Sequence, residues 1–245
     1  MNETIKTQLN HRSIRQFKPL ALTREEVNLL VDVARHTATS NFRQSYSIIS
    51  ITDGTLKKEI AEIANQPYIP NAGHLFVFVV DQRRNTLIAE AKGAEALVQG
   101  SPERFISAFS DAMIAAQNMV VAAGMGTVYL GSILNDNAKL SELLKLPKYV
   151  YPAVGLAVGW PDQEPQLKPR LPRHVIHMEN YYRDLEHPLE ELKDYDAEVH
   201  EYYDLRDLNK RVDEFTTQIA KTMDQSVANR ANTLKDLQKQ GFFTD

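Results

Sequence analysis

LFVFVV, residues 75–80, is an uninterrupted apolar run that contains three valines. Such a run is typical of a β-strand that is buried on both faces of a sheet. A β-branched run at 46–52 (YSIISIT) predicts a second strand, and two more are expected at about 127–131 and 153–159. Helical patterns lie between these strands, so the sequence predicts an α+β core with four short strands among larger helices.

Capping patterns mark where several helices should begin. Thr23 and Glu26 form a capping-box pattern that opens a helix running to about Arg35. Asp53 can cap a helix that follows the 46–52 strand. Other helices are expected at 2–10, 83–98, 102–123 and 136–145. The middle of the 102–123 helix is apolar nearly all round, which is typical of a helix at the centre of a fold or in a subunit interface.

The character of the chain changes after about residue 160. A proline-rich segment is followed by an acidic, tyrosine-rich one, and an amphipathic helix is expected near 211–240. Because this stretch has little strong apolar periodicity, it is more typical of an arm than of a second domain. We therefore expect a core formed by 1–160 and an arm, 161–245, that belongs to the same fold.

Composition excludes several classes of protein. The formal net charge is −4 and the pI is about 6.0, so no overall basic field attracts the chain to nucleic acid or to an anionic membrane. The absence of cysteine excludes disulfides, thiolate nucleophiles and cysteine-ligated metals. The N-terminal residues lack the apolar core of a signal peptide, and the apolar run at 150–160 is too short to span a bilayer. We expect a soluble, cytoplasmic protein.

Two short basic stretches are candidate anion sites. HRSIRQF (11–17) and LKPRLP (167–172) would each, taken alone, fit an ordinary basic surface segment. In LKPRLP the prolines favour extended backbone, so Lys168 and Arg170 should point the same way, about 6.5–7 Å apart. A phosphate monoester carries about −1.5 to −2 charges and needs several cationic donors. Together the two stretches supply such a set: His11, Arg12, Ser13, Arg15, Lys168 and Arg170.

The remaining motifs argue against several kinds of site. AAGMGTVYLGS (122–132) follows a helix and opens a strand, which is the reverse of a dinucleotide-binding fingerprint, and no P-loop sequence is present. The end of that strand instead predicts a place where a flat ligand approaches the backbone. His174 and His177 lack accompanying ligands, so we expect no metal site. No Ser-His-Asp or paired-carboxylate motif stands out, so no amino-acid catalyst is assigned.

Seven motifs, in this order along the chain, resemble those of the nitroreductase superfamily: HRSIRQF (11–17), TATSNFRQSYSII (37–49), NQPYI (65–69), TVYLGSILN (127–135), GLAVGWP (155–161), LKPRLP (167–172) and HMENYY (177–182). The subgroup they resemble most contains the oxygen-insensitive class A nitroreductases and the NADPH–flavin oxidoreductases. The resemblance implies a nitroreductase-like fold, with a central mixed β-sheet flanked by helices. It also implies an intertwined homodimer with one FMN per subunit at its interface, where 161–245 supplies an FMN-completing loop.

The resemblance also implies roles for individual residues. FMN would be held by the N-terminal stretch, a serine-containing loop, a glutamine, the strand end and LKPRLP: His11, Arg12, Ser13, Arg15, Thr39, Ser40, Asn41, Gln66, Tyr129, Leu130, Gly131, Ser132, Lys168 and Arg170. A cation, either Lys168 or Arg12, would stabilise reduced flavin near N1 and O2. Arg206 and Arg211 would contact the 2′-phosphate of NADPH, because arginine suits phosphate; the alternative is that both are ordinary surface cations.

The implied activity is that of an FMN-dependent NADPH oxidoreductase. Hydride would pass from NADPH to FMN and then to free flavin, a nitroaromatic or a quinone, in ping-pong turnover. One alternative is a flavin-binding storage or sensor protein without efficient turnover. Another is a phosphate-ligand or nucleic-acid binding protein without a redox role. The expected partners are a second copy of the chain and small-molecule acceptors, with no nucleic acid and no membrane.

Overall fold

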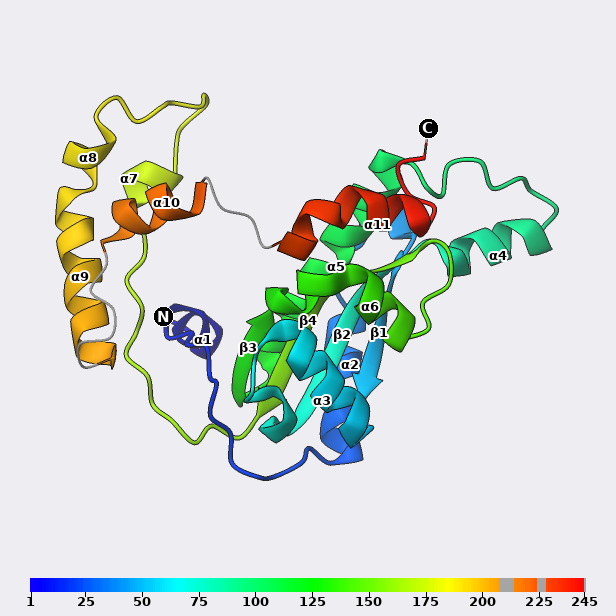
Figure 1. Ribbon diagram of the computed structural model, residues 1–245, viewed down its shortest axis with the longest axis horizontal. Helices are drawn as coiled ribbons and strands as arrows, with labels where there is room; N and C mark the ends of the chain where they lie inside the picture. Colours follow the sequence, from blue (N-terminus) through cyan, green and yellow to red (C-terminus); the bar gives the residue numbers. More distant parts are fainter. Residues whose placement is uncertain (208–213, 224–227, 245) are drawn as a thin grey trace. The chain divides into compact units, whose positions relative to one another are not determined.

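The central strand β2 (His74–Asp81) has all eight of its residues buried, as the apolar run at 75–80 predicts. In this computed structural model β2 lies between β1 (Tyr46–Ile51) and β4 (Val150–Gly159). β3 (Gly126–Leu130) pairs with the other edge of β4, which gives the strand order β1-β2-β4-β3 (Figure 1). The predicted α+β class and its four strands are confirmed.

The structure describes residues 1–207, 214–223 and 228–244. Its α-helices are, in chain order, α1 (Glu3–Leu9), α2 (Arg24–Arg35), α3 (Gly54–Ala64), α4 (Arg83–Ala91), α5 (Pro102–Ala122), α6 (Asn137–Leu143), α7 (Arg173–Ile176), α8 (Pro188–Glu191), α9 (Lys193–Asp207), α10 (Phe215–Met223) and α11 (Thr233–Lys239). Four short 3-10 segments complete the set: η1 (Ser40–Phe42), η2 (Ile69–Asn71), η3 (Gly131–Asp136) and η4 (Ala228–Asn232).

The three strand pairings are all antiparallel. The mixed character expected of the sheet is therefore reduced, within the described residues, to one isolated parallel bridge between Ser13 and Thr127. This bridge arises because the segment between α1 and α2 runs alongside β3 in the same direction as that strand. The sheet proper is antiparallel, and its single parallel contact lies at its β3 edge.

Helices cover both faces of the sheet. Successive side chains of a strand point to opposite faces, so Val77 and Val79 pack with residues of α3 and α6. Phe76 and Phe78 point the other way and pack with residues of α2 and α5. Burial on both sides explains why the central strand is apolar without alternation.

The predicted helix starts are confirmed in atomic detail. The Thr23 hydroxyl accepts from the Glu26 backbone N–H at 3.2 Å, and the Glu26 carboxylate accepts from the Thr23 N–H at 2.7 Å, which completes the capping box. Asp53 caps α3 by accepting from the backbone N–H of Leu56 at 2.8 Å. Such caps satisfy backbone donors that the first helical turn leaves free.

Two predicted helices end elsewhere than expected. The helix predicted at 83–98 stops at Ala91, because Gly93 adopts a left-handed backbone with φ of 74° and terminates it. The prediction of a single helix near 211–240 is wrong. The described part of that stretch contains α10 and α11 as separate helices, which pack into different clusters.

The chain forms two compact units, Met1–Glu164 with Val227–Asp245, and Pro165–Ser226. The first contains the sheet and α11, whose Leu237 packs with Phe242 and Tyr151. The second has its own small core, formed by α9 with Phe215 of α10. The predicted long helix divides because its two parts bury their apolar residues in different units.

Among the described helices, α5 is long and apolar enough to cross a membrane by length and composition. Its buried positions form one stripe that packs on the sheet: Ala108, Asp111, Ala112, Ala115, Ala116, Met119 and Val120. A core helix of a globular protein meets the same length and composition criteria, and α5 has this role here.

The buried His74 makes the stability of the fold depend on pH. Burial, with a smaller effect from the charge of Lys57, lowers the pKa of His74 from 6.5 to about 4. The unfolded chain therefore binds a proton between pH 6.5 and 4 that the folded chain excludes. The free energy of unfolding is therefore not reduced by His74 above pH 6.5, and it decreases as the pH falls from 6.5 towards 4.

We predict that wild type loses roughly 3 kcal/mol more free energy of unfolding than His74→Gln between pH 7 and pH 4. Urea unfolding at a series of pH values measures both curves. The variant is the control for all other titrating groups, because glutamine does not titrate. Parallel curves for the two proteins would show that His74 is not held neutral by the fold.

Candidate flavin site

The N-terminal segment between α1 and α2 is fixed to the edge of the sheet. Ser13 bridges Thr127 of β3, and the Ile14 N–H donates to the Thr127 carbonyl at 3.0 Å. Farther along, Phe17 bridges Pro161 beyond the end of β4. Ile14 and Phe17 are both buried in the cluster that covers this face of the sheet. Pairing and burial together fix the backbone that carries the predicted FMN residues.

Close contact between this segment and β3 depends on Gly126. A Cβ at Gly126 would lie 2.9 Å from three side-chain carbons of Ile14, including its Cβ. The Ile14 Cβ cannot move by rotation of the side chain alone, so the segment itself would have to shift. The absence of a side chain at Gly126 is therefore part of the site's geometry.

Arg12 is the half-buried cation of this segment. Its Nε is buried and has no hydrogen-bond partner among the described residues, and its Nη1 makes only a long contact of 3.4 Å with the Asn10 carbonyl. A buried guanidinium donor without an acceptor is unfavourable. The donor set of Arg12 therefore fits an anionic ligand.

Arg15 lies next to the predicted Gln66 loop. Its guanidinium is hydrogen-bonded to the hydroxyl of Tyr68, and its backbone N–H donates to Oε1 of Gln163 at 2.7 Å. Burial raises the pKa of Tyr68, and the charge and hydrogen bond of Arg15 oppose that rise. The structure thus brings together the HRSIRQF and NQPYI motifs, which are far apart in sequence. It also gives Arg15 a different environment from Arg12.

The predicted residues 129–132 lie where β3 ends and η3 begins. Burial raises the pKa of Tyr129 to about 12, so its hydroxyl stays protonated and donates to Oε1 of Gln117 at 3.0 Å. Leu130 is buried, whereas Gly131 is exposed, and a Cβ at Gly131 would meet no atom within 4 Å. Space beside this backbone agrees with the expected approach of a flat ligand.

Arg230 was not predicted from the sequence. It donates from Nη2 to the Gly131 carbonyl at 2.8 Å, and from Nε and Nη2 to Oδ1 of Asn135 at 3.1 and 2.9 Å. The contact orders the turn after β3 from the C-terminal part of the chain. No local pattern around Arg230 distinguishes it from an ordinary surface arginine.

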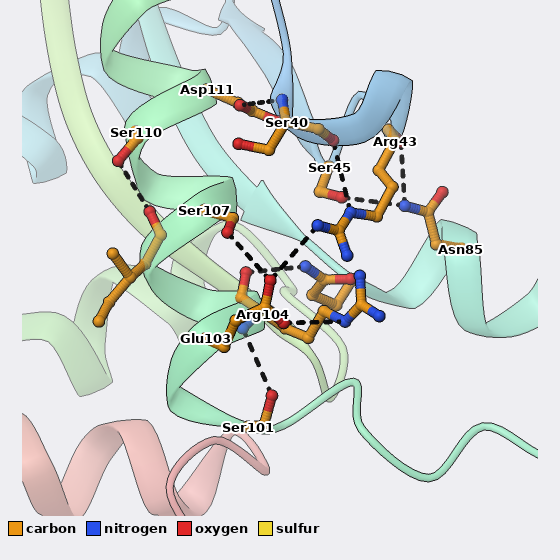
Figure 2. Close-up of polar contacts among 12 residues, drawn as sticks. Ser40, Arg43, Ser45, Asn85, Ser101, Glu103, Arg104, Ser107, Ser110 and Asp111 are labelled. Atoms are coloured by element: carbon orange, nitrogen blue, oxygen red, sulfur yellow. Dashed lines mark hydrogen bonds and ion pairs between the residues drawn. The ribbon is translucent and has the colours of Figure 1, made fainter.

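The serine-containing loop is held by α5. The Ser40 N–H donates to Oδ1 of Asp111 at 2.9 Å (Figure 2). Thr39 and Ser40 are half-buried, whereas Asn41 is exposed and has a left-handed backbone with φ of 50°. Asp111 could have been found in the sequence, because it is an acid within the apolar stripe of the 102–123 helix.

The remaining predicted residues lie in the second unit or beyond the described chain. Lys168 and Arg170 are exposed in the segment before α7, which belongs to the second unit. Arg206 lies in the last turn of α9, and Arg211 is outside the described residues. Across 1–207, 214–223 and 228–244, no group of three or more His, Cys, Asp or Glu residues could hold a metal ion.

A cavity of about 850 Å³ lies beside the serine-containing loop. Its walls come from α2, the 42–48 segment, α4 and the 95–99 segment. None of the predicted FMN residues lines it, so the cavity does not coincide with the candidate flavin site.

The fold and this site define an α+β protein with a cationic segment fixed to a sheet edge. The model of the Nitroreductase family matches residues 9–160, and the model of the Nitroreductase family, C-terminal domain, matches 168–245. The chain belongs to the nitroreductase family, which confirms the predicted resemblance and fold.

Curated relatives match over almost the whole chain. It is 41% identical over 234 residues to the FMN reductase (NADPH) of Bacillus subtilis. The aligned region covers 92% of this chain and 93% of the relative. It is 38% identical over 240 residues to an NADPH-dependent oxidoreductase of Staphylococcus saprophyticus, with 95% of each chain covered.

Solved structures agree with this assignment. The NfrA1 nitroreductase of B. subtilis superposes with a TM-score of 0.92 at 38% identity, covering 99% of this chain and 100% of that one. The NADPH:FMN oxidoreductase of Vibrio harveyi complexed with NAD+ gives a TM-score of 0.88 at 31% identity, with full coverage of both chains.

We predict that Gly126→Ala lowers the free energy of unfolding by about 1–3 kcal/mol and weakens FMN binding, because the new methyl group displaces Ile14 and the segment carrying Arg12. Chemical denaturation and flavin titration measure the two effects. Gly54→Ala is the matched control, because a Cβ there meets nothing within 4 Å. Equal stability and equal flavin affinity for both variants would contradict the close packing described for Gly126.

Proposed function

We propose that the protein is an FMN-dependent NADPH oxidoreductase. The observation that carries the proposal is the buried Nε of Arg12, which lacks a partner among the described residues on a segment fixed to β3. An FMN phosphate would supply the missing acceptor through charge-assisted hydrogen bonds. The relatives' names, FMN reductase (NADPH) and NADPH-dependent oxidoreductase, bear out the predicted enzyme class and both cofactors.

The different environments of Arg12 and Arg15 suggest different roles for them. Arg12 would bind the phosphate, while Arg15, bonded to Tyr68, would lie near the flavin with Gln66. The other proposed FMN residues are His11, Ser13, Thr39, Ser40, Asn41, Tyr129, Leu130, Gly131, Ser132, Lys168 and Arg170. When bound, FMN accepts a hydride from NADPH and passes it to an acceptor. The chain's own contribution is to bind and orient the reactants.

We propose Arg206 and Arg211 as contacts for the 2′-phosphate of NADPH, on the chemistry of arginine with phosphate. A ping-pong order follows if NADPH and the acceptor use the same space in turn. Free flavin, nitroaromatics and quinones are the acceptor classes we propose, because a flat aromatic molecule needs little beyond room to stack.

We further propose that the protein is a cytoplasmic homodimer, in which 1–160 forms the core and 161–245 completes the site and the interface. Ile106 and Ile114 of α5 support an interface, since they are 61% and 49% exposed and lie eight positions apart on one side of the helix. Exposed apolar residues on the same side of a helix are typical of a protein contact surface.

We predict that the purified protein is yellow and that anaerobic NADPH bleaches its flavin absorbance, with NADH reacting more slowly. Stopped-flow absorbance followed by reoxidation with an acceptor panel measures this. Bound flavin that NADPH fails to reduce would instead support the storage or sensor alternative. A colourless protein that does not take up added FMN would overturn the proposed function.

A further inference from the structure

Segment 39–44, which includes the proposed flavin loop, has a strained backbone. Asn41, Phe42 and Gln44 have left-handed φ values of 50°, 58° and 51°, and none of them is glycine. A non-glycine residue is strained in this conformation, asparagine less than most. Such a segment persists only where surrounding groups fix it.

Asp111 is the buried group that fixes this segment. It is 2% exposed and lies in the stripe of α5 that faces the sheet, among Ala108, Ala112 and Ala115. Its Oδ1 accepts from the Ser40 N–H at 2.9 Å, immediately before the first left-handed residue (Figure 2). A carboxyl group in an apolar stripe is costly, so its position calls for a role beyond packing.

Other contacts hold the segment at Arg43. Arg43 pairs with Glu103 at 3.3 Å, but the Glu103 side chain is 62% exposed, so this ion pair contributes little. Asn85 of α4 donates to the Arg43 carbonyl at 3.0 Å. These contacts reach Arg43, between the left-handed Phe42 and Gln44, whereas the Asp111 contact reaches Ser40, before the first left-handed residue, from a side chain that is 2% exposed. Oδ2 of Asp111 is also buried and has no partner among the described residues, so Oδ1 is the oxygen engaged with the loop.

We infer that Asp111 is a positioning residue that holds the Ser40 loop in the shape that receives FMN, an inference that rests on the proposed function. A loop held in its binding conformation before the ligand arrives loses less conformational entropy on binding. Asp111 itself would touch neither FMN nor a substrate. Its effect passes through one backbone hydrogen bond to Ser40.

The test measures the Kd for FMN by flavin fluorescence and amide hydrogen exchange of flavin-free protein. Asp111→Ala is expected to raise the Kd about 10-fold and to speed exchange in peptides covering Ser40–Gln44. Asp111→Asn keeps an acceptor for the Ser40 N–H, so it should restore slow exchange and bring the Kd to within about threefold of wild type. An equal loss of FMN affinity and an equal increase in loop exchange in both variants would overturn the role of the hydrogen bond.

Two control variants separate positioning from general destabilisation. Met119→Ala removes a buried side chain from the same helix without touching the loop, and should lower Tm while leaving loop exchange and Kd near wild type. Ser110→Ala removes only a bond to the Ile106 carbonyl within α5. If Met119→Ala raised the Kd as much as Asp111→Ala, Asp111 would have a merely structural role and the inference would fail.

The outcomes also separate this inference from the proposed function. Wild type that binds no FMN would refute the proposed function, whereas loop exchange in the flavin-free variants would still report on the Asp111 contact. Wild type that binds FMN, with Asp111→Ala unchanged in both Kd and exchange, would refute the inference alone.

Discussion

The backbone bridge between Ser13 and Thr127 is the contact on which the proposed site depends. The segment between α1 and α2 has no helix or strand of its own, so its position comes from pairing with β3 and from burial of Ile14 and Phe17. Gly126 permits the approach that this pairing requires. A flexible basic segment thereby becomes a fixed set of donors at a sheet edge, which reduces the entropy lost when an anion binds.

The fold fixes the second loop of the site by a different means. Segment 39–44 pairs with no strand among the described residues. Side chains from α4 and α5 hold Ser40 and Arg43, which lie beside its left-handed residues. The long apolar helix α5 therefore covers one face of the sheet and also presents a single carboxyl group to a loop. In both cases a functional segment without a strand or an α-helix of its own takes its shape from a rigid element beside it.

The sequence allowed much of this to be predicted, and the failures have physical causes. Apolar runs and caps identified the strands and the starts of the helices, because these depend on local periodicity. The end of α4 shortly before Gly93 is also a local feature of the sequence, because glycine favours the left-handed backbone that terminates a helix. The division of the 211–240 stretch could not be predicted, because it depends on which core each half packs against.

The same division between local and long-range information applies to the site. HRSIRQF could be identified as an anion site because its cationic residues are close together in the sequence. The family resemblance predicted that the anion is FMN. The different surroundings of Arg12 and Arg15 could not be predicted, because Tyr68 approaches Arg15 only in the folded chain. Arg230 likewise contacts the 131–135 turn only after folding, and its sequence neighbourhood carries no signal.

Flavin affinity measures directly whether Arg12 contacts the FMN phosphate. FMN and riboflavin differ only in the phosphate, so their Kd values should be compared in flavin-free wild type and in Arg12→Ala. We expect wild type to prefer FMN strongly, and the variant to lose about 10-fold or more in FMN affinity with riboflavin affinity unchanged. An equal loss for both flavins, or no loss for either, would contradict it.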